Sequence, residues 1–371
     1  MKKALIVGII CIFFLPVKVN GNDITPNDTS YYNYSEIDKV LEENEFSFDE
    51  VVNLFVEGKT DEALKYIGDG IIDVIFYELE TQKGVLIKII SIGIIAAVFT
   101  NLSSSFNSGK ISETGFYITF TAILGMLVAG YQIAANLVLE ALGRLLELME
   151  AMVPVYVLSV GFSAGQTTAT SVYQIIALVI LLIQKVIITV IIPLIYTYMI
   201  FGLLNNVVSG SFLTKACELI KTGVNWILKA MLSIIIGLNV IQGLINPVVD
   251  TIKANALHKT AGMIPGIGNT LSSMSEIILG SGTLIKNSIG MAAVVAIIIV
   301  SFAPVIKITI MSLAYKASGA VLEPISDKRV VNAVSNIYDS MALLGKTLLY
   351  GVVFFILTIA IVCSTTNHGI T

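Results

Sequence analysis

The sequence predicts an all-α, polytopic helical membrane protein with an internal duplication and an N-terminal translocated helical segment. Of its 371 residues, 56% are hydrophobic and 13% are charged, and the mean hydropathy is +0.88. A soluble domain is about a quarter charged, so most of this chain is expected to lie in lipid. Residues 22–84 carry 16 acidic and 4 basic residues, a net charge of −12, whereas the chain from residue 85 onward carries 10 acidic and 15 basic residues, a net charge of +5.

The N-terminus has the pattern of a secretory signal. Lys2 and Lys3 precede an apolar run at 4–15, which is too short to span a bilayer. We therefore expect a signal peptide at 1–21, with an uncleaved anchor as the alternative. In both cases residues 22–84 are translocated and form an acidic extracytoplasmic helical head. The basic body agrees with this placement, because Lys and Arg are retained on the cytoplasmic side.

Within the head, apolar residues at helical spacing between 34 and 80 predict two or three short amphipathic helices. Ser47 precedes the acidic pair Asp49 and Glu50, which is typical of a helix N-cap. Gly58 interrupts this helical spacing of apolar residues. The many carboxylates are interpreted as solvated helix faces rather than as acid/base pairs.

The body divides into a first transmembrane span at 85–109, membrane repeat 1 at 110–220, membrane repeat 2 at 221–322, and a last unit at 323–371. That last unit contains a charged loop, an amphipathic helix and the last span. Polar loops or connections are expected at Asn107–Thr114, Asn205–Asn225 and Asn246–Ala261.

Three further segments of the body lead to specific expectations. The amphipathic segment Glu140–Glu150 has an apolar stripe and is typical of helices in the membrane interface. The apolar run 172–204 would be about 50 Å long as a helix, against a hydrocarbon core of about 30 Å. It is therefore expected to break, at Gln184–Lys185 or at Pro193. The span at 289–315 is likewise expected to break at Pro304.

The duplication rests on prolines that recur at one separation. Met152–Pro154 aligns with Met263–Pro265 at an offset of about 111 residues, and Pro193 aligns with Pro304 at the same offset. Each first proline begins a stretch rich in Gly, Ser and Thr, at 152–171 and 262–290. Irregular backbone is tolerated in a membrane only inside protein or beside a watery cavity. These stretches are expected inside the fold, either closely packed or lining a central site or pore.

Candidate functional residues come from these elements. An ionisable residue inside a membrane is a functional candidate, and snorkelling to the interface is the alternative, above all for Lys286. No carboxylate lies in the middle of a long apolar run, which argues against a transporter coupled to protons or sodium. The structural or pore-lining candidates are Pro154, Gly161, Gly165, Lys185, Pro193, Pro265, Gly266, Gly268, Gly282, Lys286, Pro304 and Lys307.

The sequence lacks the groups of residues that catalysis would require. The two histidines, His258 and His368, have no Cys or carboxylate cluster beside them, so a zinc site and a Ser-His-Asp triad are both excluded. The three cysteines do not form a disulfide framework. The expectation is a protein that is not an enzyme, with no catalytic residue, metal or cofactor.

Four segments carry a resemblance to a known family: GMIPGIGNTLSSMSEIILGSGTLIKNSIG at 262–290, APVIKI at 303–308, YK at 315–316 and EPISDKRVVNAVSN at 323–336. Together they resemble the stage III sporulation protein AE family. The resemblance implies a spore-forming Firmicute and a multi-pass subunit of a channel or secretion-like complex. That complex lies in the mother-cell membrane around the engulfed forespore and is required for endospore development. No catalytic residue is carried over.

Membrane lipid and the other subunits of that complex are the implied partners, with a homo-oligomer as a further option and no nucleic acid. Two other functions stay open: a stand-alone secondary transporter built from inverted repeats, and a structural scaffold for other subunits. An odd number of crossings per repeat would make the halves inverted, and an even number would make them parallel.

Overall fold

The computed structural model describes residues 32–41, 47–63, 109–207, 212–261 and 268–365, together with single helical positions between 76 and 98. For 109–116, 238–279 and 364–365 it describes the backbone alone. The expected signal peptide at 1–21 and most of the expected first span at 85–109 lie outside the described residues.

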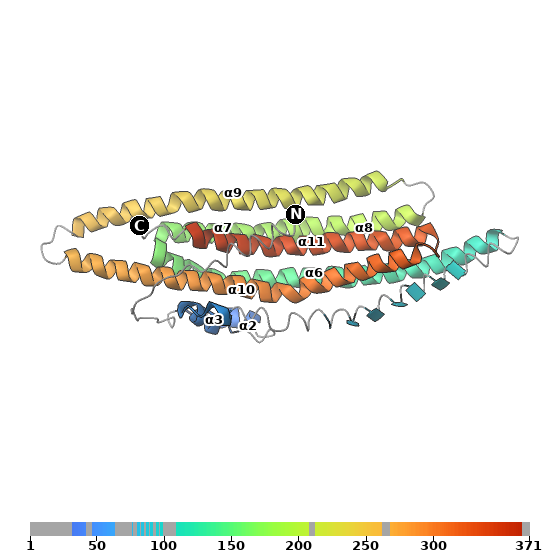
Figure 1. Cartoon of the computed structure of the whole chain (residues 1–371). Coiled ribbons are helices and arrows are strands. Elements are labelled where there is room, and N and C mark those ends of the chain that lie inside the picture. The colour runs from blue at the N-terminus through green and yellow to red at the C-terminus, as the bar shows by residue number, and fades with distance from the viewer. Residues whose placement is uncertain are drawn as a thin grey trace.

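The described body is a set of long helical rods that run alternately in opposite directions (Figure 1). One rod is composite and passes from α-helix to π-helix and back without a turn. Two short helices of the head precede the rods. In chain order the elements are α2 (Ser35–Leu41), α3 (Phe48–Val56), α6 (Gly109–Ala164), α7 (Gln166–Leu182), the π-helix η3 (Ile183–Ile191), α8 (Ile192–Val207), α9 (Thr214–Ala261), α10 (Gly268–Leu322) and α11 (Lys328–Thr365).

The rods pack in layers around one core. α10 packs most extensively on α11 and α6, and α11 also contacts α8 and α9. α9 covers one side of the bundle by packing on α7, α8 and α11, whereas the head helices lie on the other side, α2 against α6 and α3 against α10 (Figure 1). Apolar side chains of the head, such as Ile37 and Phe48, are fully buried in the same core.

The protein is a multi-pass membrane protein. In the described part of the chain, five helical segments are long and apolar enough to cross a bilayer, at Tyr117–Ala164, Gln166–Asn206, Thr214–Gly237, Gly280–Leu322 and Lys328–Cys363. The rods are longer than a bilayer requires. The 56 residues of α6 extend about 84 Å, against about 30 Å of hydrocarbon, so every long rod projects beyond the membrane.

The head confirms the prediction of short amphipathic helices. Ser47 is the N-cap of α3, and its hydroxyl accepts a hydrogen bond from the backbone N–H of Glu50 at 3.4 Å. After α3 the chain turns at Gly58, whose φ of 77° favours glycine. The apolar face of α3 is buried while Asp49 and Glu50 are exposed, as expected for solvated carboxylates.

The prediction that the span at 289–315 breaks at Pro304 is wrong, and Pro154 does not end a helix either. Both lie inside unbroken helices, α6 and α10. Proline removes one helical hydrogen bond and crowds the carbonyl four residues earlier. Neighbouring helices and local adjustments compensate for this loss in membrane bundles, so a proline alone does not end a helix there.

The run at 172–204 changes character where the sequence indicated, but it does not separate into two helices. Gln184 and Lys185 lie in η3, and α8 begins one residue before Pro193. The wider π turn accommodates the ring of Pro193 and its missing N–H. Within η3 the hydroxyl of Thr189 donates to the carbonyl of Gln184 at 3.1 Å.

Several predicted connections are parts of longer helices. The expected interfacial helix Glu140–Glu150 is the middle of α6, because its apolar stripe packs into the bundle rather than into lipid. The expected connection Asn246–Ala261 belongs to α9. α6 begins at Gly109 within the expected loop Asn107–Thr114, and α9 begins at Thr214 within the expected connection Asn205–Asn225. The amphipathic helix and last span of the final unit form one rod, α11.

The internal duplication stays a prediction. Pro193 and Pro304 both lie in the second rod of their pair, as a repeat requires. Pro154, however, lies well before the turn between α6 and α7, whereas Pro265 falls between the end of α9 and the start of α10. The two turns therefore do not match at the offset that aligns the prolines.

The predicted interruption within 152–171 is confirmed at Gly165, between α6 and α7. Gly165 has φ 99° and ψ 163°, a backbone conformation that residues with a Cβ rarely adopt. Its carbonyl accepts the first helical hydrogen bond of α7, from the N–H of Ala169 at 3.1 Å. Gly165 thus allows α7 to reverse direction directly after α6.

Replacing Gly165 with Ala is expected to lower the free energy of unfolding by about 1–3 kcal/mol, because alanine is strained in this conformation. Denaturant unfolding of the purified protein in micelles measures the change. Gly125→Ala is the matched control, since Gly125 is helical and a Cβ there meets nothing within 4 Å. Equal stability of both variants would contradict the role of Gly165.

Candidate functional site

The two Gly/Ser-rich stretches singled out in the sequence meet in the structure, along a seam between the last turns of α6 and the early turns of α10. A Cβ placed on Gly282 would lie 3.5 Å from the backbone of Phe162 and Ser163. Across the turn, a Cβ on Gly161 would lie 3.6 Å from the Cβ of Ala169. Small residues at these positions let the backbones approach closely.

Lys286 lies on the same face of α10, one turn after Gly282, and its residue is 0% exposed. Gly290 follows one turn later. A Cβ at Gly290 would overlap the Sγ of Cys363 and would lie 3.4 Å from the hydroxyl of Tyr156. The absent side chain therefore leaves the space in which Tyr156 of α6 and Cys363 of α11 meet.

Those two side chains connect three helices. The hydroxyl of Tyr156 lies 2.9 Å from the Sγ of Cys363 and donates to the carbonyl of Ile359 at 3.4 Å. Lys286 is close enough to Cys363 to interact with it electrostatically. The seam thus places an amine, a phenol and a thiol together inside an apolar bundle.

Further polar atoms of α10 are buried next to Lys286 in the sequence. Ser288 is 0% exposed, and its hydroxyl and the Oδ1 of Asn287 have no hydrogen-bond partner among the described protein atoms. On α6, Ser159 donates to the carbonyl of Tyr156 at 2.8 Å. Buried polar atoms are normally satisfied by protein or water. The unpaired polar atoms of Asn287 and Ser288 therefore have the chemistry to hold water or a small polar solute.

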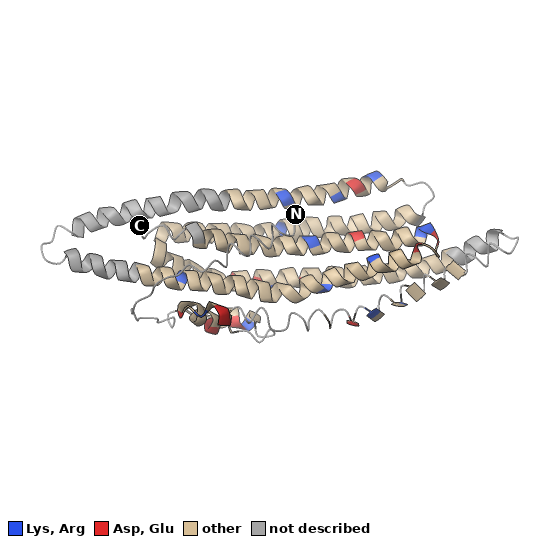
Figure 2. Cartoon of the chain, in the orientation of Figure 1, with Lys and Arg blue, Asp and Glu red and all other residues tan. Residues whose placement is uncertain are grey.

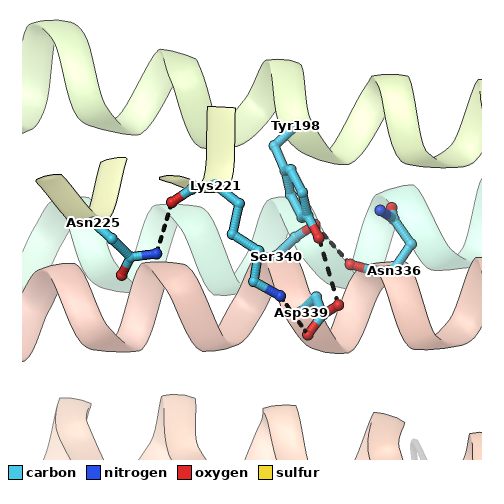
Figure 3. Close-up of polar contacts among 6 residues, drawn as sticks. All are labelled: Tyr198, Lys221, Asn225, Asn336, Asp339 and Ser340. Atoms are coloured by element: carbon cyan, nitrogen blue, oxygen red, sulfur yellow. Dashed lines mark hydrogen bonds and ion pairs between the residues drawn. The ribbon is translucent and has the colours of Figure 1, made fainter. Parts of the chain in front are cut away.

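A second polar network joins α8, α9 and α11 (Figure 3). Asp339 of α11 pairs with Lys221 of α9 at 3.4 Å and accepts a hydrogen bond from the hydroxyl of Tyr198 of α8 at 3.5 Å. Asn225 donates to the carbonyl of Lys221 at 2.7 Å and accepts from Lys346. These contacts fix how α9 sits on the bundle.

Close packing continues beside that network. A Cβ on Gly202 of α8 would overlap the side-chain amide of Asn336, whose Oδ1 is buried without a partner among the described protein atoms. Ser340 donates to the carbonyl of Asn336 at 2.7 Å. Sequence reasoning missed this network. The sequence does show the polar residues Asn336 and Asp339 close together on the amphipathic helix. Their partners on the other helices, however, are more than 100 residues away in the chain.

The charged loop before α11 is confirmed as a turn. Asp327 accepts hydrogen bonds from the backbone and side chain of Arg329, at 2.8 and 3.2 Å. Partial burial alone would raise the pKa of Asp327, but the hydrogen bonds and charge of Arg329 hold it below its usual value. The guanidinium also lies over the ring of Tyr117, 5.8 Å from its centre. The loop is thereby anchored to the start of α6.

The other predicted residues are distributed along the rods. Lys185 is exposed on η3, and Lys307 is half-buried on α10 about 30 Å beyond Lys286, at a rise of 1.5 Å per residue. Gly268 is the first residue of α10. Pro265 and Gly266 lie outside the described residues. In the part of the chain that the structure describes, no group of three metal-binding side chains is present.

Replacing Gly290 with Ala is expected to lower the free energy of unfolding by about 1–3 kcal/mol, because the added methyl overlaps Cys363 and overpacks the seam. Gly280→Ala, where a Cβ meets nothing within 4 Å, is the control on the same helix. It should leave stability unchanged or raise it by up to about 1 kcal/mol. Denaturant unfolding in micelles compares the two variants. An unchanged free energy of unfolding for Gly290→Ala would show that the seam is not closely packed.

Comparison with known proteins gives the family. The sequence model described as stage III sporulation protein AE matches residues 46–366. The stage III sporulation protein AE of Bacillus subtilis (strain 168) is 22% identical over 298 residues, which cover 79% of this chain and 74% of that protein. No solved structure matches the chain significantly. The family match spans most of the chain and includes the seam of α6, α10 and α11, and the chain belongs to the stage III sporulation protein AE family.

Proposed function

We propose that the chain is a multispanning membrane subunit of a channel or secretion-like complex, located in the mother-cell membrane around the forespore and required for endospore development. Its sporulation family and its apolar rods support this role. The observation that carries the proposal is the fully buried Lys286 in a seam of small residues. A cationic residue is costly in a membrane and is retained there mainly for function.

The distribution of charge supports one orientation. Lys and Arg gather at the end of the bundle where α9 and α11 begin (Figure 2). That end carries Lys215, Lys221, Lys316, Lys328 and Arg329. Basic residues near the ends of spans are retained in the cytoplasm. We therefore place this end in the cytoplasm and the acidic N-terminal segment outside it.

The direction of the rods weighs against a transporter built from inverted repeats. Segment 110–220 contributes α6 and the composite rod α7–η3–α8, and segment 221–322 contributes α9 and α10. Each segment thus crosses the bundle twice, and α6 and α9 run in the same direction (Figure 1). Copies related in this way would be parallel rather than inverted.

A structural scaffold is the second candidate function. The contact of Gly282 with the backbone of α6 is a packed one, and close packing without a solute path is what a scaffold requires. In both roles membrane lipid and the other subunits of the complex are the partners, and no catalytic activity, cofactor or nucleic acid is involved.

Topology reporters fused after Lys110, Lys221 and Lys328 test the orientation. Each of these residues lies at or near the start of a rod at the same end of the bundle, so all three fusions are expected to report the cytoplasm. Paired cytoplasmic and extracytoplasmic reporters make every position give a positive signal with one of them. Opposite signals from residues 110 and 221 would restore the inverted arrangement.

Deletion of the gene in its host is expected to abolish heat-resistant spores, and Lys286→Met should lower their number toward that of the deletion strain. Methionine keeps the length of the side chain but removes its charge. Immunoblots of membrane fractions should show unchanged amounts of the variant. Normal sporulation with Lys286→Met would favour the scaffold, and normal sporulation of the deletion strain would refute the proposed function.

A further inference from the structure

The composite rod α7–η3–α8 is about twice as long as the hydrocarbon layer is thick. Its 41 residues, Gln166–Asn206, extend about 60 Å, against about 30 Å of hydrocarbon. Lys185 is the single charged residue of this segment and lies half-way along it, directly after Gln184. Each half of the rod is therefore long enough to cross the membrane, and Lys185 marks a place where one crossing can end.

Helices α10 and α11 each carry a lysine at one common height. A Cβ on Gly345 of α11 would lie 3.3 Å from the side chain of Ile308 of α10. The two helices run in opposite directions (Figure 1). Lys346, which follows Gly345, is therefore level with Lys307, which precedes Ile308. Both lysines are half-buried.

Helix α9 brings a tryptophan and a further lysine to this height. Lys346 donates a hydrogen bond to Asn225 of α9. Trp226 is the next residue of α9, and Lys229 follows about 5 Å further along the axis. Trp226 is 73% exposed and Lys229 is exposed. The outer surface of α9 therefore combines an indole and an amine at the height of Lys346.

Lys185 belongs to the same layer. A Cβ on Gly202 of α8 would overlap the side chain of Asn336 of α11, and the two rods run in opposite directions (Figure 1). Counting along both helices from this contact puts Lys185 level with about residue 353 of α11, about 10 Å beyond Lys346. Its side chain is exposed. α9 packs on α7 and α8, which flank η3, so Lys185 lies on a rod next to that of Lys229.

Helix α6 carries both signs of charge in this layer. A Cβ on Gly351 of α11 would lie 2.8 Å from Leu142 of α6, which puts Arg144 level with about residue 353 of α11. Arg144 pairs with Glu140 at 3.1 Å, and Glu147 follows on the same helix. All five rods thus carry a basic residue within a layer about 10 Å deep, and α6 also carries carboxylates there.

A layer of this composition is typical of a membrane–water interface. Tryptophan is enriched where hydrocarbon meets water, and lysine lays its stem along apolar surface while its amine reaches the headgroups. The headgroup region is about 5–8 Å thick on each side of the hydrocarbon, which is comparable with the depth of the layer. Basic clusters at this height attract anionic lipids.

We propose that Lys185 and Lys229, with Trp226 beside them, bind the headgroups of anionic phospholipids at one surface of the membrane. The two amines supply the charge, and the indole ring packs against the upper part of the acyl chains. This site lies on the side of the bundle that α9 covers, where the charged residues of the layer are lysines. The carboxylates of α6 would repel such lipids.

The inference goes beyond the proposed function by naming a lipid class. It rests on the membrane placement of the rods, and its assignment to the cytoplasmic leaflet rests on the orientation proposed above. Lipid binding is measured in vesicles and sporulation in the host, so a negative result here leaves the proposed function standing.

Quenching of tryptophan fluorescence tests the site, because Trp226 is the single tryptophan of the chain. The full-length protein is reconstituted in vesicles of equal parts phosphatidylcholine and phosphatidylglycerol, with bromine on the acyl chains of one lipid or of the other. Brominated phosphatidylglycerol is expected to quench more strongly, through an enrichment of up to about fivefold for each lysine. Equal quenching by the two lipids, or no quenching by either, overturns the proposal.

Substitutions identify the side chains responsible. Lys185→Gln combined with Lys229→Gln should abolish the enrichment, whereas arginine at both positions should preserve it. Lys215→Gln is the matched control, because it removes a charge from α9 about 20 Å from Lys229 and should change nothing. Circular dichroism checks that each variant is helical. Enrichment that survives the double glutamine variant, or that Lys215→Gln removes equally, contradicts the assignment. The comparison of the two lipids with the unaltered protein stands even where a variant fails to fold.

Discussion

The close approach of α6 to α10 is the contact on which the rest of the bundle depends. Inside lipid, helices gain nothing from burying apolar surface against each other, so packing and hydrogen bonds hold them together. Gly282 and Gly290 supply that packing by omitting side chains where Phe162 and Tyr156 come near. The space at Gly290 also brings Cys363 of α11 to the pair. A side chain there would separate three helices and expose the buried Lys286 to lipid.

The network around Asp339 has a different role because its ion pair is partly exposed. The side chains of Lys221 and Asp339 are 43% and 41% exposed, and a pair of that kind contributes at most about 1 kcal/mol. The pair matters instead for how the helices are aligned. With Tyr198 and the bond between Lys346 and Asn225, it sets the register of α9 against α8 and α11. Stability therefore comes from the seam, and the alignment of the outer helix comes from this network.

Local chemistry was predictable from the sequence, and long-range packing was not. The Ser47 cap, the turn at Gly165 and the charged loop before α11 follow from residues close together in the chain. The predicted break at Pro304 was wrong because neighbouring helices support that proline. The stretch that holds Lys286 was expected inside the fold, with snorkelling as the alternative for Lys286 itself. The electrostatic interaction of Lys286 with Cys363, and the pairing of Lys221 with Asp339, join residues too far apart for spacing to indicate.

The segment Glu140–Glu150 shows why the same pattern can arise from two environments. A helix half in lipid headgroups and a helix half in a bundle both alternate apolar and charged faces. The structure separates the two environments, because the apolar stripe of this segment is buried in the bundle. At about 2.5–3.5 kcal/mol for each charge in lipid, four such residues would cost about 10–14 kcal/mol, as much as a whole domain gains by folding. The charged face of this segment is therefore placed away from lipid hydrocarbon.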